Sequence, residues 1–202
     1  MDRVYVLFTD TDFDMGEVLK KLPRFRLERV QHIKNREQKK QSVLSSLLLR
    51  YAFLDAFGVD VFDFEVVYTE KGKPRFLEKD NLYFNLAHTN GAAVCIVSDT
   101  ECGIDVEQAC RKISEAVQER FLGKVYSSSK EAICEWVKKE SYGKFTGEGL
   151  ICDVQEKEVQ FGFFDVSDDV GNSYKGCICK RTFVTPLKTQ IKTLSEIFDK
   201  LK

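Results

Sequence analysis

Residues 136–144 read Trp136-Val-Lys-Lys-Glu140-Ser-Tyr-Gly-Lys144, so that Trp136, Glu140 and Lys144 follow one another at four-residue intervals. In a helix these three side chains share one face, which then carries an aromatic ring, a carboxylate and an ammonium group. The plain alternative is an exposed Glu140–Lys144 ion pair, which stabilises a helix by only about 0.2–0.5 kcal/mol. Because Trp136 argues against a fully exposed face, the segment predicts a partly buried charged site.

A second acidic segment lies upstream and reads Gly103-Ile-Asp105-Val-Glu107. If it forms a strand, its two carboxylates point to one side and its two aliphatic side chains to the other. Two such acids alone are more often a solvated strand edge than a metal site. Together with Glu140 they provide three carboxylates, the ligands that Mg²⁺ prefers, and Lys144 adds a cation for a phosphate. The two segments therefore predict phosphate chemistry.

Composition limits the class of protein. The chain has 202 residues, 43% of them hydrophobic, and a formal net charge of −1, which suits one large domain or two small lobes. No apolar run approaches the ~20 residues that a membrane-spanning helix needs. Seven cysteines lack the spacing of a zinc site or a disulfide framework. We expect reduced thiols in a soluble cytoplasmic protein.

The charge is unevenly distributed. Between Lys20 and Lys40 nine lysine and arginine residues stand against only Glu28 and Glu37. Such a run is more often a solvated helix face or a linker. The alternative is a site for a polyanion, either nucleic acid or a phosphorylated cofactor.

The hydrophobic pattern predicts a mixed α/β (α+β) chain. Strands are expected over residues 3–8, 62–69, 83–86, 92–97, 104–107, 159–164 and 174–180. Helices are expected over 14–22, 38–57, 114–122, 128–145 and 193–201. The pattern restarts after residue 100, which predicts two lobes, an N-terminal one over 1–100 and a C-terminal one over 101–202.

Two shorter segments place polar groups at expected bends. Phe84-Asn-Leu-Ala-His88-Thr89 brings a histidine and a hydroxyl to the turn that should follow the strand. A single histidine is more often a structural hydrogen-bonding residue, but a neighbouring phosphate would raise its pKa and keep it protonated. Gly72-Lys73-Pro74 is a bend that needs no function of its own.

The chain resembles the 4′-phosphopantetheinyl transferases of the Sfp type in five segments that occur in the family's order. These are Gly72-Lys73-Pro74, Phe84-Asn85-Leu86-Ala87-His88-Thr89, Gly103-Ile104-Asp105-Val106-Glu107, Trp136-x-x-Lys139-Glu140-x-x-x-Lys144 and Gly147-x-Gly149-Leu150. The resemblance extends from about Arg24 to Leu150. It implies two similar α/β lobes related by pseudo-twofold symmetry, with coenzyme A bound between them.

The resemblance also implies a reaction. The phosphopantetheine arm of coenzyme A would pass to a serine of an apo acyl or peptidyl carrier protein, with release of adenosine 3′,5′-bisphosphate. Asp105, Glu107 and Glu140 would bind Mg²⁺ together with the coenzyme A pyrophosphate. Glu140 would also act as the base for the serine, and Lys144 would stabilise or protonate the leaving phosphate. Glu140, Lys144 and Glu107 are therefore the expected catalytic residues.

A coenzyme A site follows from the same resemblance. His88 and Lys144 would contact its phosphates, Lys73 and Pro74 would line the adenine end, and the 3′-phosphate would meet Arg24, Arg26, Arg29 and Ser42. The family usually has a serine at the position of Ala87, and Thr89 offers a hydroxyl that compensates in part. We expect an active enzyme with weaker affinity for coenzyme A.

Two other functions compete with this interpretation. One is a module that binds coenzyme A or a nucleotide but has lost catalysis, which the presence of all three acids and Lys144 disfavours. The other is a metal-dependent phosphodiesterase or nuclease, which the low overall basicity disfavours. We expect a monomer with no nucleic-acid or membrane partner.

Overall fold

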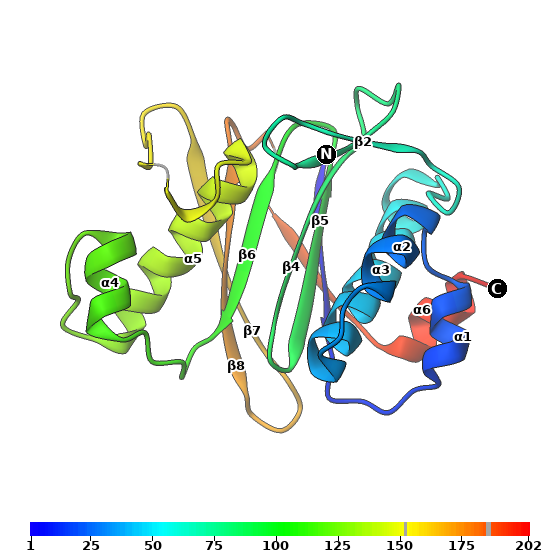
Figure 1. Cartoon of the computed structure of the whole chain (residues 1–202), viewed down its shortest axis with the longest axis horizontal. Helices are drawn as coiled ribbons and strands as arrows, with labels where there is room; N and C mark the ends of the chain where they lie inside the picture. The colour runs from blue at the N-terminus through cyan, green and yellow to red at the C-terminus, as the bar shows by residue number, and fades with distance from the viewer. Residues whose placement is uncertain (152, 185–186) are drawn as a thin grey trace.

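Two β-sheets lie face to face at the centre of the molecule, and helices cover both outer surfaces (Figure 1). The structure is a computed structural model that describes residues 1–151, 153–184 and 187–202. The first sheet contains, in spatial order, β4 (Tyr83–Thr89), β5 (Ala92–Ser98), β1 (Asp2–Phe8) and β9 (Lys188–Lys192). The second contains β6 (Gly103–Gln108), β8 (Ser173–Lys180) and β7 (Gln160–Ser167). A separate ribbon pairs β2 (Val66–Tyr68) with β3 (Pro74–Phe76).

The helices fall into two groups. On the side of the first sheet lie α1 (Met15–Lys20), α2 (Arg24–Gln31), α3 (Arg36–Phe57) and α6 (Leu194–Lys200) (Figure 1). On the side of the second sheet lie α4 (Glu115–Leu122) and α5 (Ser129–Thr146), followed by the short 3₁₀ turn η1 (Gly149–Ile151). The mixed α/β class that the sequence predicts is confirmed.

Strand alternation distributes the apolar side chains among the layers. On β5, Val94 and Ile96 belong to the core between the two sheets, whereas Cys95 and Val97 pack with the helices of the first group. On β6, Ile104 and Val106 belong to the core between the sheets. Because side chains alternate along a strand, Asp105 and Glu107 lie on the opposite face, which α5 covers.

The long helices begin and end close to the predicted positions. Asn35 caps α3 by accepting a hydrogen bond from Gln38, and Ser128 caps α5 by accepting one from Glu131. Gly147 ends α5 in the left-handed conformation, with φ of 80°. These local signals place Glu140 and Lys144 on one helix beside the second sheet.

Other parts differ from the predictions. The basic run contains the helix α2, and His88 lies within β4 because this strand continues to Thr89 before the turn at Gly91. Residues 188–192 form β9, which was not predicted and pairs in parallel with β1. The chain does cross from the first sheet to the second near residue 100. However, β9 and α6 return to the first sheet, so residues 101–202 do not form one contiguous lobe.

Among the described cysteines all six are free thiols, in line with the expectation of reduced cysteines. Cys152, the seventh, lies outside the described residues. No helix in the described part of the chain combines the length and the apolar character needed to cross a membrane.

Gly103 allows α5 to lie directly on β6. A Cβ atom at this position would lie 2.1 Å from the carbonyl oxygen of Ser141 and 2.5 Å from the backbone nitrogen of Phe145. We expect Gly103→Ala to lower the free energy of unfolding by about 1–3 kcal/mol in a urea titration, because α5 must move away. Gly16→Ala is the control, since its Cβ would meet only the Asp14 carboxylate at 3.2 Å. Equal stability of the two variants would contradict this packing.

Candidate functional site

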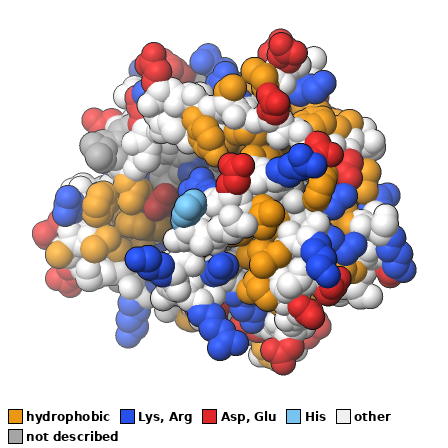
Figure 2. All heavy atoms as spheres, turned by 45° about the vertical axis from the view of Figure 1, so that its right-hand side comes forward, with side chains coloured by type: hydrophobic (Ala, Val, Ile, Leu, Met, Phe, Trp, Pro, Cys, Tyr) orange, Lys and Arg blue, Asp and Glu red, His pale blue; other side chains and the backbone are white. Residues whose placement is uncertain are grey.

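A cavity of about 520 Å³ opens between α2, α3 and β4 and extends to α5. Its volume is in the range of small-molecule sites in proteins. In the space-filling view, basic side chains gather around a histidine beside a hollow in the surface (Figure 2). The cavity is lined by Arg26, Arg29, Ile33, Gln38, Gln41, Ser42, Ser45, Pro74, Phe84, Asn85, Leu86, His88 and Lys144.

Two arginines of α2, Arg26 and Arg29, line this cavity and give it the positive charge that an anion would require. Arg26 is only 8% exposed and donates a hydrogen bond from Nε to Ser46 Oγ at 2.9 Å. In the described part of the chain, neither Arg26 nor Arg29 is ion-paired with a carboxylate. Burial, and then the charge of Arg29, lower the pKa of Arg26 to about 10. The guanidinium therefore stays charged at neutral pH, and an anion in the cavity would stabilise it.

His88 is accessible at the edge of the same cavity. Its pKa is lowered by loss of hydration and then by the positive charges of Lys144, Arg26 and Arg29. Without a ligand the imidazole is therefore biased toward its neutral form. A phosphate among these cations would oppose their effect and favour the protonated form that the sequence led us to expect.

The carboxylates lie next to this cavity, between β6 and α5. Asp105 and Glu107 are both buried, and Lys144 Nζ donates to Asp105 Oδ1 at 2.7 Å. Glu107 is held by an ion pair with Arg111 at 2.5 Å. Lys144 thus pairs with an acid of the neighbouring strand, so the surface Glu140–Lys144 bridge considered above is not what the structure contains.

The cations near the three acids do not fully compensate the negative charge of these buried carboxylates. Burial raises the pKa of Asp105 even though Lys144 opposes this effect. Burial and then Asp105 raise the pKa of Glu140, with Glu107 adding to the shift and Lys144 opposing it. Oδ2 of Asp105 is buried and has no hydrogen-bond partner among the described residues. These three carboxylates therefore interact with one another, and one of their oxygens is unsatisfied.

The donor set fits Mg²⁺, which takes carboxylate oxygens together with water and substrate phosphates. As the side chains lie, however, no three described histidine, cysteine or acidic side chains are arranged to hold a metal ion. Two of the acids are instead paired with cations, Asp105 with Lys144 and Glu107 with Arg111. An ion bound by Asp105, Glu107 and Glu140 would compete with these two pairs.

Trp136 is buried, as the sequence predicts, and supports the charged face of α5 from the side. Its ring packs edge-to-face on Phe121 with centroids 6.2 Å apart, and the Arg111 guanidinium lies 5.5 Å from the ring centroid. The tryptophan thus also orients the arginine that is paired with Glu107.

Six of the nine residues predicted to bind the cofactor line the cavity, namely Arg26, Arg29, Ser42, Pro74, His88 and Lys144. Arg24 points elsewhere and is ion-paired with Asp63 at 2.7 Å on the surface. Neither Thr89 nor Lys73 lines the cavity, and the Lys73 ammonium donates to the backbone carbonyls of Cys102 and Phe145 instead.

Sequence reasoning missed several lining residues. Gln38, Gln41 and Ser45 accompany Ser42 on one face of α3, and their helical spacing could have identified them. Asn85 lies in a segment that the prediction used, but its contact is tertiary, since its Oδ1 accepts a hydrogen bond from the Ile104 amide at 3.0 Å. No local signal reveals such a contact.

In sequence the chain is similar to enzymes of known activity. A 4′-phosphopantetheinyl transferase of Bacillus subtilis is 23% identical over 160 residues, which cover 73% of this chain and 71% of that protein. The 4′-phosphopantetheinyl transferase gsp of Aneurinibacillus migulanus is 29% identical over 120 residues, which cover 54% of this chain and about half, 49%, of that protein. No family model matches the chain. The resemblance predicted from the five motif segments is confirmed.

Proposed function

We propose that this relative of the 4′-phosphopantetheinyl transferases transfers the 4′-phosphopantetheine arm of coenzyme A to a serine of an apo acyl or peptidyl carrier protein. The observation that carries the proposal is that Lys144 belongs both to the cavity and to the acidic group. This lysine lines the cavity with Arg26, Arg29 and His88, and it is also ion-paired with Asp105 of the acidic group. A phosphate-rich ligand in the cavity would therefore end beside three carboxylates that favour a divalent cation.

The proposed ligand matches the distribution of charge. Coenzyme A has a 3′-phosphate and a pyrophosphate, and the cavity offers them two arginines, His88 and Lys144. Arg26 and Arg29, with Ser42, would bind the 3′-phosphate. Pro74 would lie at the adenine, and Ala87 leaves the pyrophosphate one hydroxyl fewer than the family usually has.

In the proposed reaction the serine Oγ attacks the phosphorus that bears the pantetheine arm, and the bridging P–O bond of the pyrophosphate breaks. Mg²⁺ bound by Asp105, Glu107 and Glu140 would supply the positive charge that the pyrophosphate needs. Glu140, whose raised pKa suits a base, would take the serine proton directly or through water. Lys144, once released from Asp105, would donate to the phosphate of the departing adenosine 3′,5′-bisphosphate.

We also propose that the two halves are related by a pseudo-twofold axis. In support, a long helix covers each sheet on its outer face, α3 on the first and α5 on the second (Figure 1). Such an arrangement would complete the site within one chain, which is why we expect the protein to act as a monomer.

The test is direct. The protein is incubated with Mg²⁺, coenzyme A and apo carrier proteins from fatty acid, polyketide and nonribosomal peptide synthesis, and the carriers are analysed by mass spectrometry. We expect one carrier serine to gain one phosphopantetheine group. Coenzyme A binding with no gain on any carrier would point to the binding module, and hydrolysis of nucleic acid without a carrier would point to the phosphodiesterase.

Lys144→Ala separates chemistry from binding. We expect kcat to fall about 10- to 100-fold, because the charge on the leaving phosphate is no longer neutralised. The Kd for coenzyme A should rise less, about threefold, because Arg26 and Arg29 still hold the 3′-phosphate. Single-turnover kinetics and calorimetry measure the two effects. A larger effect on affinity than on kcat would assign Lys144 to binding alone.

A further inference from the structure

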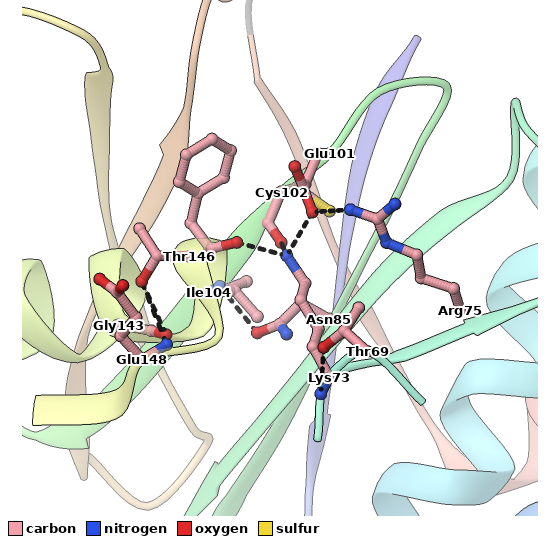
Figure 3. A network of polar contacts seen from close by, with 11 residues as sticks. Thr69, Lys73, Arg75, Asn85, Glu101, Cys102, Ile104, Gly143, Thr146 and Glu148 are labelled. Atoms are coloured by element: carbon pink, nitrogen blue, oxygen red, sulfur yellow. Dashed lines mark hydrogen bonds and ion pairs between the residues drawn. The ribbon is translucent and has the colours of Figure 1, made fainter. Parts of the chain in front are cut away.

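The turn of the β2–β3 ribbon inserts a lysine between the two elements that carry the acids. Lys73 is 9% exposed, and its Nζ donates to the carbonyl oxygen of Phe145 at 2.7 Å and to that of Cys102 at 3.2 Å (Figure 3). Its own amide donates to Thr69 Oγ1 at 3.0 Å, which fixes the ribbon at this point. A single ammonium group therefore joins three separate segments of the chain.

The two carbonyls belong to the framework of the proposed metal site. Phe145 lies in the last turn of α5, where carbonyl groups lack helical partners and attract cations. Cys102 directly precedes β6, and Asp105 follows three residues later. Lys73 thus ties the end of the helix that carries Glu140 to the beginning of the strand that carries Asp105.

Burying the charged ammonium of Lys73 costs free energy, so stability alone does not explain why a lysine holds these elements together. Burial lowers the pKa of Lys73, and the main opposing charge is Glu101, whose Oε1 lies 3.4 Å from Nζ. Glu101 is shared, because it also accepts from Arg75 at 2.6 Å (Figure 3). Apolar residues often replace such buried charges without loss of stability, so a specific geometric role accounts better for the lysine.

A second contact holds β6 from the first sheet. Asn85 of β4 accepts a hydrogen bond from the amide of Ile104, the residue before Asp105 (Figure 3). The backbone on the N-terminal side of Asp105 is therefore fixed at two points, at Cys102 by Lys73 and at Ile104 by Asn85. Asp105 can then present its carboxylate to α5 with little freedom.

We propose that Lys73 is a positioning residue that sets the separation between β6 and α5, and with it the geometry in which Asp105, Glu107 and Glu140 bind a divalent cation. The inference rests on the proposed function for the identity of the site. It differs from the expectation that the Lys73 side chain contacts coenzyme A, because the ammonium is occupied by two backbone carbonyls and does not line the cavity.

The experiment compares Lys73→Met with Lys71→Met. Both residues lie on the same ribbon and reach the end of α5, but Lys71 does so through an exposed ion pair with Glu148. Mn²⁺ binding to the coenzyme A-free protein is followed by electron paramagnetic resonance, coenzyme A binding by calorimetry, and transfer by kcat and KM. We expect Lys73→Met to weaken Mn²⁺ binding and lower kcat by about tenfold each, with coenzyme A affinity within about twofold. Lys71→Met should change none of them by more than about twofold.

Two results would overturn the proposal. Wild-type affinity for Mn²⁺ in a folded Lys73→Met protein would exclude a positioning role, and a selective loss of coenzyme A affinity would assign the lysine to substrate binding. If circular dichroism shows that Lys73→Met does not fold, Lys73→Gln is used in its place. Glutamine retains an N–H donor for the carbonyl groups, so this variant should keep part of the wild-type affinity for Mn²⁺. No remaining Mn²⁺ affinity in a folded Lys73→Gln protein would count against the role. A wild-type protein that binds Mn²⁺ but modifies no carrier would contradict the proposed function while leaving this inference standing.

Discussion

Replacing Glu140 by glutamine is expected to reduce kcat/KM for transfer by at least about 100-fold and, in the same protein, to raise the melting temperature measured without metal. The loss of activity follows from the two roles proposed for this carboxylate, as a ligand of Mg²⁺ and as the base for the carrier serine. An amide of the same shape can neither take a proton nor neutralise the ion, so both contributions are lost together.

The gain in stability follows from the sign of the pKa shift. Burial and the neighbouring Asp105 raise the pKa of Glu140 above the value of an unfolded glutamate. The charged form is therefore disfavoured in the metal-free fold, and at neutral pH ionised Glu140 lowers the free energy of unfolding. Glutamine has no charge to bury, so its substitution removes this cost.

The measurements are steady-state transfer with a responsive carrier and thermal unfolding in the presence of a chelator. Glu135→Gln is the control, because Glu135 lies on the same helix in a loose ion pair with Lys138 at 3.8 Å. Its activity should stay within about twofold of wild type. Transfer by Glu140→Gln within about threefold of wild type would refute the proposed roles, and a lower melting temperature would refute the electrostatic argument.

Local signals in the sequence were sufficient for the elements that carry the acids. The helix α5 has a serine cap, a regular apolar stripe and a terminal glycine, and β6 alternates acidic and aliphatic residues. Each of these signals acts within a few residues, so α5 and the two faces of β6 could be predicted without knowledge of the fold.

The missed elements depend on distant parts of the chain. The strand β9 is short and largely exposed, and its parallel pairing joins residues near the two ends of the sequence. The helix α2 follows Pro23 without a side-chain cap and is rich in charge, so its sequence favours no particular structure. Tertiary packing, which no local pattern encodes, determines both.

The same distinction applies to the site. Asp105, Glu107, Glu140 and Lys144 lie in motifs of fixed spacing, so the sequence alone brings them to attention. Arg26, Arg29 and Ser42, which line the cavity, were expected there only from the family resemblance. Two of the contacts these residues make depend on tertiary packing and could not be selected in this way. Asp105 is paired with Lys144, and Lys73 with two carbonyl groups, only because α5 and the ribbon approach β6. The pair of Glu107 with Arg111, four residues later, is by contrast local.

Arg26→Met should weaken coenzyme A binding by about 100-fold without destabilising the ligand-free protein. The expected loss corresponds to a charge-assisted phosphate contact in a buried site. Burial lowers the pKa of Arg26 to about 10, so the charged guanidinium is disfavoured in the empty cavity. Methionine keeps the apolar stem and removes the charge, which offsets the loss of the hydrogen bond to Ser46.

Calorimetry with coenzyme A and with its 3′-dephospho form distinguishes loss of a contact between Arg26 and the 3′-phosphate from a general loss of affinity for the ligand. The wild type should prefer coenzyme A, and Arg26→Met should lose most of this preference because the lost contact is to the 3′-phosphate. Arg24→Met provides a matched control on the same helix, since Arg24 is paired with Asp63 outside the cavity and should not affect either affinity. If Arg26→Met retains the preference, or if Arg24→Met loses it, the 3′-phosphate does not bind at Arg26 and the orientation proposed for coenzyme A is wrong.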